Sequence, residues 1–231
     1  MTRIYSYVLR YDDGAAPNPF WGICTLAICK PAIRRTARVG DWVIGTGSKH
    51  SRCNDGTLQD FSDSLVYAMR VSDIKSLAGY DAFCKTELPD KIPNKQASDW
   101  TARMGDCIYD YGQEPFPAIR AGVHNEGNRD RDLRGKNVLL SDLFYYFGEE
   151  PRILPFELRG LIKQNQGHRK IENPYLVSHF EEWISQYERN KLYADPQLRS
   201  HFDQEISCST YSVCAQQHFE EDEVETEEVI C

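Results

Sequence analysis

The chain has 231 residues, of which 41% are hydrophobic and 27% are charged. This balance is that of a globular protein with room for one sizeable core, not of a disordered chain. No apolar run reaches the roughly 18 residues of a membrane helix, and the N-terminus lacks the apolar middle and cleavage site of a signal peptide. We therefore expect a cytoplasmic protein without membrane partners.

The net charge of −8 comes from one short segment. Residues 220–228 hold seven acids in nine positions, and the other 28 acids nearly balance the 27 bases. Self-repulsion and a low apolar content disfavour packing of such a run. We expect residues 219–231 to form a disordered tail, so the acidic net charge does not exclude a nucleic-acid partner.

In chain order, the first half predicts strands joined by irregular loops. Residues 3–11 alternate and are rich in aromatic and β-branched side chains, which is typical of a strand. Glycine and prolines then impose a loop over residues 12–22. Residues 42–44 are expected to form a buried strand that opens into a glycine-containing turn, and residues 64–74 a further strand.

The second half predicts more helix. Residues 87–99 are polar and contain two prolines, which indicates an exposed loop, and the charged, glycine-bearing segment 124–137 is expected to be another. Residues 137–148 favour a strand that leads into a turn or a helix. Residues 155–167 predict a helix, and the apolar side chains of 173–190 have the spacing of an amphipathic helix.

The order of these elements predicts an α+β fold. We expect one domain over residues 1–218, with a helical portion from about residue 151. The sequence contains no internal repeat and no clear linker.

The cysteines argue against both a disulfide framework and a metal site. They are irregularly spaced and form no CxxC pair, and the six histidines have no zinc-finger spacing. We expect reduced thiols, no metal and no cofactor, and we interpret Cys24 and Cys29 as small core residues. The eight positions are Cys24, Cys29, Cys53, Cys84, Cys107, Cys208, Cys214 and Cys231.

Two turns are candidates for a nucleobase site. Asn18, Phe20 and Trp21 lie in a proline-stiffened loop that offers stacking faces and an amide, which is the chemistry that holds a flipped or free base. The turn at 45–48 offers small residues and the hydroxyls of Thr46 and Ser48 to a ligand. The alternatives are that both rings plug the end of the core and that residues 45–48 form a simple turn.

Basic residues form two clusters that are candidates for contacts with phosphate. Lys30, Arg34 and Arg35 belong to the first, and residues 129–136 form the second. If the clusters lie side by side, they create a positive face for phosphates. The acids interleaved in the second cluster favour an internally neutralised, solvated loop instead.

Acid–base candidates are present, but the sequence contains no complete catalytic signature. It has no GxSxG, GxxxxGK, HExxH or GxGxxG motif. Asp12 follows the first strand, and Asp106 and Tyr109 flank Cys107. Two carboxylates matter for catalysis if they share a pocket, because proximity separates their pKa values.

Three motifs resemble a known family. They are the strand YSYVLRYD with the following APNPFWGICTLAICKPAIR, the segment VGDWVIGTGS, and NVLLSDLFYYFG. Together they resemble the nucleotide modification associated domain 2, found in bacterial and phage settings of DNA base modification. The resemblance covers roughly residues 4–150.

A weaker resemblance extends to PUA-like domains, which include the EVE, ASCH and YTH domains. It implies a small curved or barrel-like mixed sheet with flanking helices and, in several members, an aromatic cage around a modified base. On this analogy Trp42 joins Phe20, Trp21, Thr46 and Ser48 as a base contact. Alternation along the strand leaves Trp42 equally suited to the core.

These features give two main functional hypotheses. In the first, the chain recognises a modified nucleobase or nucleotide, free or in DNA or RNA, in base modification or anti-phage defence. In the second, it is an enzyme of base modification, a base-excising glycosidase or a group transferase. Asp12 or Asp106 then acts as general acid or base and Tyr109 stabilises charge. A third is an interaction protein whose acidic tail mimics nucleic acid or binds a basic partner.

Overall fold

The centre of the molecule is a curved, mixed β-sheet. The computed structural model describes residues 1–114, 116–164 and 167–198. The strands run in the order β13-β1-β3-β6-β11-β14, and β12 also pairs with β6. β1 and β3 are parallel, whereas β6 is antiparallel to β3. The bounds are β1 Ile4–Leu9, β3 Trp42–Gly47, β6 Ser64–Arg70, β11 Leu143–Tyr146, β12 Arg152–Ile153, β13 His168–Ile171 and β14 Lys191–Leu192.

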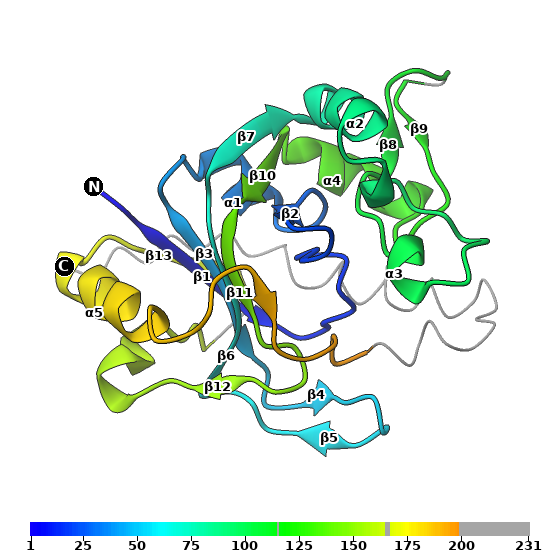
Figure 1. Cartoon of the computed structure of the whole chain (residues 1–231). Helices are drawn as coiled ribbons and strands as arrows, with labels where there is room; N and C mark the ends of the chain where they lie inside the picture. The colour runs from blue at the N-terminus through cyan, green and yellow to red at the C-terminus, as the bar shows by residue number, and fades with distance from the viewer. Residues whose placement is uncertain (115, 165–166, 199–231) are drawn as a thin grey trace.

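A second, three-stranded sheet continues the first around a corner (Figure 1). It consists of β2 (Cys24–Leu26), β10 (Asn137–Ser141) and β7 (Asp73–Ser76). The chain runs directly from β6 into β7 and from β10 into β11. β6 pairs with β11 in the first sheet and β7 pairs with β10 in the second, and both pairs are antiparallel. One long bent ribbon therefore belongs to both sheets, which gives the curved α+β architecture expected from the sequence.

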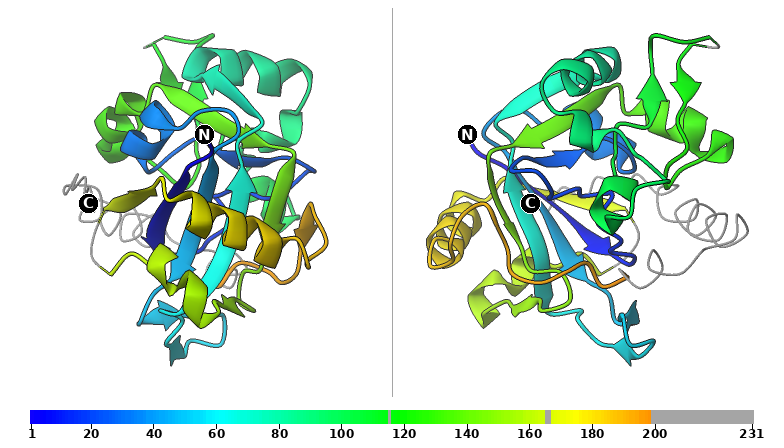
Figure 2. Two further views of the ribbon diagram at one scale, coloured as in Figure 1. Left: turned by 90° about the vertical axis from the view of Figure 1, so that its left-hand side faces the viewer. Right: turned by 45° about the vertical axis from the view of Figure 1, so that its right-hand side comes forward.

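Alternating side chains of the central sheet build two cores. Tyr5, Tyr7 and Val43 point to one face, where they pack with β2, β10 and the helix α1 (Pro31–Thr36). Ile4 and Trp42 point to the other face, where they pack with the 3₁₀ helix η3 (Phe156–Leu161) and with α5 (Pro174–Ile184). Figure 2 shows α5 covering one side of the sheet.

The remaining elements form a lobe on the side of the sheet away from α5 (Figure 2). Two smaller apolar clusters hold it together. A short hairpin, β4 (Ser51–Arg52) and β5 (Leu58–Gln59), extends below the sheet in Figure 1. The lobe contains α2 (Leu77–Thr86), η1 (Pro89–Lys91), α3 (Trp100–Arg103), β8 (Tyr109–Asp110), β9 (Ala118–Ile119), η2 (Glu126–Asn128) and α4 (Arg129–Arg134).

Some segments differ from their sequence-based expectation. The segment 87–99 contains η1, and its Lys91 is wholly buried. The charged segment 124–137 contains η2 and α4 instead of a loop, because Asn125 caps η2 and Asp132 is drawn inside by polar partners. Residues after 151 supply η3 and α5, and also three strands of the central sheet. The predicted acidic tail, 219–231, lies outside the described residues.

Candidate functional site

A partly open cavity of about 540 Å³ lies where the parallel strands β1 and β3 end. We call it the β1–β3 cavity. η3 and the residues that follow it form the opposite wall. The lining residues are Val8, Arg10, Lys30, Gly47, Ser48, Lys49, Ser62, Asp63, Arg159, Ile162, Lys163, Gln164 and Gly167.

Close backbone packing shapes the floor at the end of β3. A Cβ atom at Gly47 would lie 2.4 Å from the carbonyl oxygen of Phe61, so only glycine fits there. The next residue, Ser48, accepts a 2.9 Å hydrogen bond from the Phe61 N–H through its carbonyl oxygen, and its own N–H donates to Ser51 Oγ. These contacts hold the turn after β3 against the cavity.

Positive charge dominates the lining. The five bases Arg10, Lys30, Lys49, Arg159 and Lys163 face a single acid, Asp63. Only one of the five, Arg159, has an ion pair with that acid, and the contact is long at 3.8 Å. The β1–β3 cavity is therefore a region of positive potential at the edge of a low-dielectric core, where an anion is stabilised more strongly than in water.

Lys163 is the most informative of these bases. It is only 5% exposed, and within residues 1–114, 116–164 and 167–198 it makes no hydrogen bond or ion pair. Its ammonium nitrogen is not among the fully buried side-chain atoms that lack a hydrogen-bond partner, so it is accessible from the cavity that Lys163 lines. A lysine ammonium in such a wall is a hydrogen-bond donor for an anion.

Lys30 forms the wall next to the core. Its ammonium group lies 4.7 Å from the centre of the Tyr7 ring. Its φ of 40° is in the left-handed region, which is uncommon for a residue with a side chain. Of the predicted phosphate contacts, Lys30 is the one on the cavity wall.

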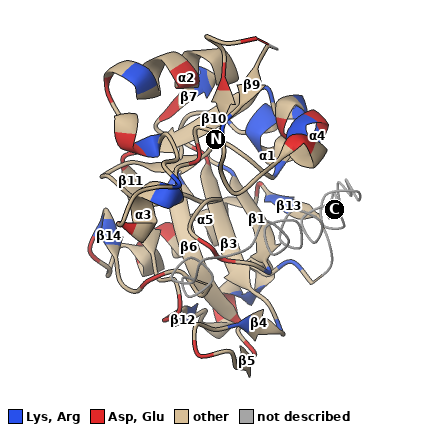
Figure 3. Ribbon diagram, turned by 90° about the vertical axis from the view of Figure 1, so that its right-hand side faces the viewer, with Lys and Arg blue, Asp and Glu red and all other residues tan. Residues whose placement is uncertain are grey.

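The other two predicted phosphate contacts lie elsewhere. Arg34 is wholly buried, and its guanidinium group occupies the space that a Cβ at Gly135 would need. Arg35 donates a 3.2 Å hydrogen bond to the Arg134 carbonyl at the surface, next to α4, where basic and acidic residues alternate (Figure 3). Their phosphate contacts stay predictions. Arg34 donates to the carbonyl oxygens of Ala27, Cys29, Asp132 and Asn137.

Of the predicted nucleobase contacts, the structure brings Ser48 to the β1–β3 cavity. Thr46 precedes it by two residues, but its side chain is fully buried and its hydroxyl lies 3.3 Å from the Tyr7 carbonyl oxygen, to which it donates. Trp42 is on the α5 face of the sheet. There its ring packs on Phe180 and its Nε1–H donates to Glu181 over 3.0 Å.

The proline-stiffened loop is packed into the lobe. Phe20 stacks edge-on against Trp21 and Trp100. Asn18 is fully buried; its amide donates to the Met104 carbonyl and its side-chain oxygen accepts from Lys91 at 2.7 Å. The structure thus separates this loop from the turn after β3, and a nucleobase role for Asn18, Phe20 and Trp21 stays a prediction.

The predicted acid–base residues belong to three separate hydrogen-bond networks. Asp12 accepts from the Tyr146 hydroxyl. Burial raises the pKa of Asp12 to about 7 against the opposing effect of this hydrogen bond. Asp106 accepts from Tyr80 at 2.6 Å and from Thr25 at 2.5 Å, and burial raises its pKa too.

The third residue of that group, Tyr109, donates a 2.9 Å hydrogen bond to Asp132. Burial and the neighbouring Asp132 raise the pKa of Tyr109 well above its ordinary value. The catalytic roles of Asp12, Asp106 and Tyr109 stay predictions.

A comparison with models of known protein families shows which family the chain belongs to. The model of the nucleotide modification associated domain 2 matches residues 1–204. The chain belongs to this family. No curated protein and no solved structure matches this nucleotide modification associated domain, so the PUA-like resemblance stays a prediction. None of the helices in the described part of the domain is long and apolar enough to span a bilayer.

The sequence analysis of this nucleotide modification associated domain missed most of the cavity. Arg10 directly follows β1, and Lys49 follows β3 after one intervening residue, so bases close to the ends of strands were a usable signal. Arg159 and Lys163 carried no such signal, because η3 reaches the cavity only through its packing on the central sheet.

Proposed function

We propose that the chain binds a nucleotide, or a nucleotide unit of a nucleic acid, through its phosphate in the β1–β3 cavity. The observation that carries this proposal is the excess of bases in the cavity, with a buried Lys163 that has no anionic partner among the described residues. Membership of a family associated with nucleotide modification favours a nucleotide over other anions.

The dimensions and chemistry of the cavity suit such a ligand. Small-molecule sites are commonly about 300–1,000 Å³ in volume, and this cavity has about 540 Å³. Lysine and arginine provide charge-assisted hydrogen bonds to phosphate oxygens, and the Ser48 hydroxyl adds a neutral donor beside them. Val8 and Ile162 give the same cavity an apolar portion that a base or sugar can cover.

Within this proposal, recognition of a modified base is the finer function. The Ser48 hydroxyl is the predicted edge contact that borders the cavity, and the phosphate supplies affinity common to all nucleotides. The enzymatic alternative draws support from Asp12, which follows the cavity strand β1 and has a pKa of about 7, suited to proton transfer near neutral pH.

Calorimetric titration with nucleosides and with their 5′-monophosphates tests the proposal. We expect the monophosphates to bind and the matching nucleosides to bind at least about tenfold more weakly, because the phosphate provides the charge-assisted contacts. Lys163→Met should weaken monophosphate binding about tenfold or more.

Lys170→Met is the matched control, because Lys170 is exposed on β13 and pairs with Glu172 at 3.5 Å. It should leave the affinity unchanged. Equal binding of nucleosides and monophosphates, or equal affinity of wild type and Lys163→Met, would contradict the proposal. A panel of plain and modified monophosphates then tests recognition of a modified base, and uniform affinities across that panel would contradict the finer function.

A further inference from the structure

The last described residue of the chain lies next to the β1–β3 cavity. The N–H of Leu198 donates a 2.9 Å hydrogen bond to the carbonyl oxygen of Asp12, and Leu198 is buried. Asp12 is two residues after Arg10, which lines the cavity, and two residues span at most about 7 Å. The C-terminal segment therefore starts close to the end of β1 where the cavity lies.

The preceding residues hold this starting point in place. The N–H of Gln197 lies 3.4 Å from a carboxylate oxygen of Asp12, and its side-chain amide donates to the Gly148 carbonyl at 3.2 Å. Asn54, in the β4–β5 hairpin, donates a 2.9 Å hydrogen bond to the carbonyl oxygen of Pro196. The fold thus sets the point from which the C-terminal segment leaves.

That segment carries a dense run of negative charge. Seven of the nine residues 220–228 are acidic and none is basic. The family model ends at residue 204, so the run lies outside the matched part of the chain. A carboxylate accepts the same charge-assisted hydrogen bonds from lysine and arginine as a phosphate does. The run is therefore complementary to a cavity whose lining has five bases and one acid.

The connecting chain is long enough for the two to meet. Residues 199–219 join Leu198 to the run, and a connection of this length spans up to about 70 Å when extended. A domain of about 200 residues has a radius of gyration of about 17 Å. The run can therefore reach the cavity while every described element keeps its position.

The other basic cluster of the sequence is a poorer partner for the run. Near α4 the bases alternate with acids (Figure 3), and Arg129 pairs with Glu126 at 2.5 Å. Arg34 is wholly buried and donates to carbonyl oxygens of the chain. Because acids are interleaved there, an acidic segment gains less than it does at the β1–β3 cavity.

We propose that the acidic run 220–228 binds in the β1–β3 cavity of its own chain and competes there with the phosphate of a nucleotide. The competition rests on the proposed nucleotide binding, whereas the docking of the run does not. Carboxylates of the run take the places of phosphate oxygens beside Lys49, Arg159 and Lys163.

The tether makes even a weak contact effective. A segment joined by a short chain has an effective concentration on the order of 1 mM at its site. If the free segment bound with a dissociation constant of about 0.1 mM, the tethered run would weaken nucleotide binding about tenfold. The run thus sets a threshold: weakly held anions are excluded, and ligands that make further contacts with the cavity displace it.

Carbodiimide crosslinking of the full chain tests the docking directly. A water-soluble carbodiimide joins a lysine to a carboxylate that it contacts, and peptide mass mapping identifies the pair. In the monomeric protein, we expect the run to be joined to Lys49 or Lys163. Lys136 and Lys170 are internal controls, because both are exposed and lie outside the cavity. Salt of about 1 M should remove the crosslinks, because it shortens the Debye length to about 3 Å.

A full-length variant with a neutral run tests the competition. All seven acids of 220–228 are replaced by the corresponding amides, which keeps the length and shape of the segment. Calorimetry should show that this variant binds nucleoside 5′-monophosphates about tenfold more tightly than wild type does.

A second variant controls for net charge. It replaces four exposed acids outside the run and the cavity, and it should bind the monophosphates as wild type does, because charges at that distance are screened. The four changes are Glu87→Gln, Asp90→Asn, Glu114→Gln and Glu182→Gln. A gain in affinity for this variant equal to that of the neutral-run variant would overturn the inference.

The remaining outcomes are distinct. Crosslinks of the run to Lys136 instead of the cavity lysines, crosslinks only between chains, or none at all overturn the inference and leave the proposed function intact. Equal nucleotide affinity of wild type and the neutral-run variant overturns the competition. Cavity crosslinks, with no nucleotide bound by either protein, overturn the proposed function and support the docking alone.

Discussion

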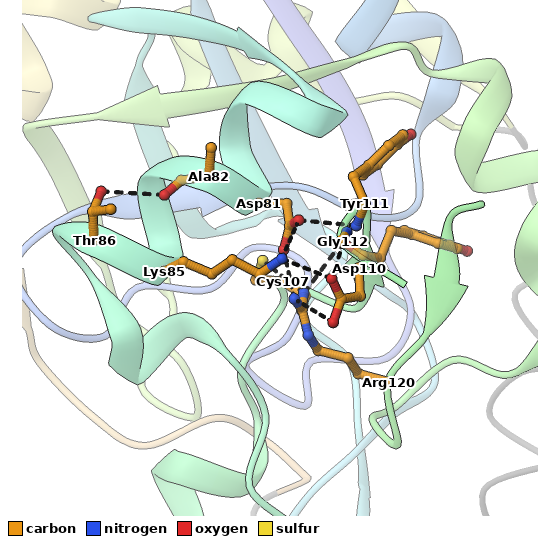
Figure 4. A network of polar contacts seen from close by, with 10 residues as sticks. Asp81, Ala82, Lys85, Thr86, Cys107, Asp110, Tyr111, Gly112 and Arg120 are labelled. Carbon is orange, nitrogen blue, oxygen red and sulfur yellow. Dashed lines mark hydrogen bonds and ion pairs between the residues drawn. The ribbon is translucent and has the colours of Figure 1, made fainter. Parts of the chain in front are cut away.

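Two charged regions of the molecule use the same residue types in opposite ways. In the lobe, Asp81, Lys85, Asp110 and Arg120 form what we call the charge ring, in which each base contacts both acids at 2.5–3.2 Å (Figure 4). At the end of β1 and β3, five bases face one acid. The ring balances two bases with two acids, whereas bases outnumber acids among the residues that line the β1–β3 cavity.

The difference separates a structural cluster from a ligand site. In the ring, Arg120 also donates to the carbonyl oxygens of Cys107 and Tyr109, so it ties β8 and β9 to α2. Burial opposes ionisation of Asp81 and Asp110, but Lys85 and Arg120 outweigh it and lower the pKa values of both carboxyl groups. Asp12, which belongs to neither region, has the opposite shift, because burial raises its pKa. Balanced charges in a buried cluster stabilise the fold, whereas an excess of one sign in a cavity favours a ligand of the opposite charge.

The largest expected effect is in the charge ring. Arg120→Met leaves Asp81, which is 4% exposed, with Lys85 alone as its cationic partner. We expect the free energy of unfolding, measured in urea, to fall by about 3 kcal/mol, the usual cost of removing one partner of a buried pair. Nucleotide affinity should not change.

Lys85→Met is the control within the ring, because 39% of the Lys85 side chain is exposed. It should cost only about 0.5 kcal/mol, as exposed ion pairs do. Equal losses for the two variants would show that the ring does not stabilise the lobe through buried charge.

The second effect is a pH dependence at Asp12. Its folded-state pKa of about 7 lies above the ordinary value of 3.8, so the folded state binds more protons and stability falls as pH rises between those values. From pH 5 to pH 7, wild type should lose about 2 kcal/mol of unfolding free energy more than Asp12→Asn does.

Asp81 and Asp110 have the opposite shift. Their stabilising contribution is complete above their ordinary pKa and is lost only at lower pH, so it does not change between pH 5 and pH 7. Parallel stability curves for wild type and Asp12→Asn over this window would contradict the raised pKa.

The smallest effect is expected at Lys163, one of two buried lysines that the next variants compare. Lys163→Met should leave the unfolding free energy unchanged or raise it by up to about 1 kcal/mol, because it removes a charge that makes no hydrogen bond or ion pair with the described residues and keeps an apolar side chain of similar length in the same wall. Lys91 is also buried, but its ammonium group donates to oxygens of Asn18, Ile23 and Thr25 at 2.7–3.0 Å.

Lys91→Met should therefore cost about 3 kcal/mol, since it leaves these acceptors unsatisfied. Urea unfolding of the two variants, compared with wild type, measures both changes. A loss for Lys163→Met as large as that for Lys91→Met would show that Lys163 is a structural lysine.

Local pattern predicted the strands better than it predicted the lobe. β1 lies within its predicted segment, and the helix at 173–190 is confirmed as α5. β3 begins where predicted but continues to Gly47, so residues 45–47 belong to the strand and not to the predicted turn. Segment 87–99 was predicted to be exposed because it is polar, yet Lys91 enters the core, where four oxygens of residues 18–25 accept hydrogen bonds from its ammonium group. Polarity indicates exposure only when no distant partner neutralises it.

The candidate sites show the same division. Lys30 and Ser48 were identified from local clusters of charge and hydroxyls, and both line the cavity. Cys29 was expected to be a small core residue, and Asp132 was read as part of a solvated charge run. In the structure both are buried in contact with His124, which lies 95 residues after Cys29, and no local spacing encodes that distance.

The sequence by itself determined the strands β1 and β6, the near-neutral body with its acidic C-terminal run, and the supply of bases and thiols, because these depend on side-chain periodicity and composition. Only the tertiary structure decided which charges are paired, which lysine is buried without an anion, and which thiol meets an imidazole. Pairing and burial depend on contacts between residues far apart in the sequence, 39 positions for Asp81 and Arg120 and 95 for Cys29 and His124. The electrostatic effect of a charge is set by such neighbours and by its access to water.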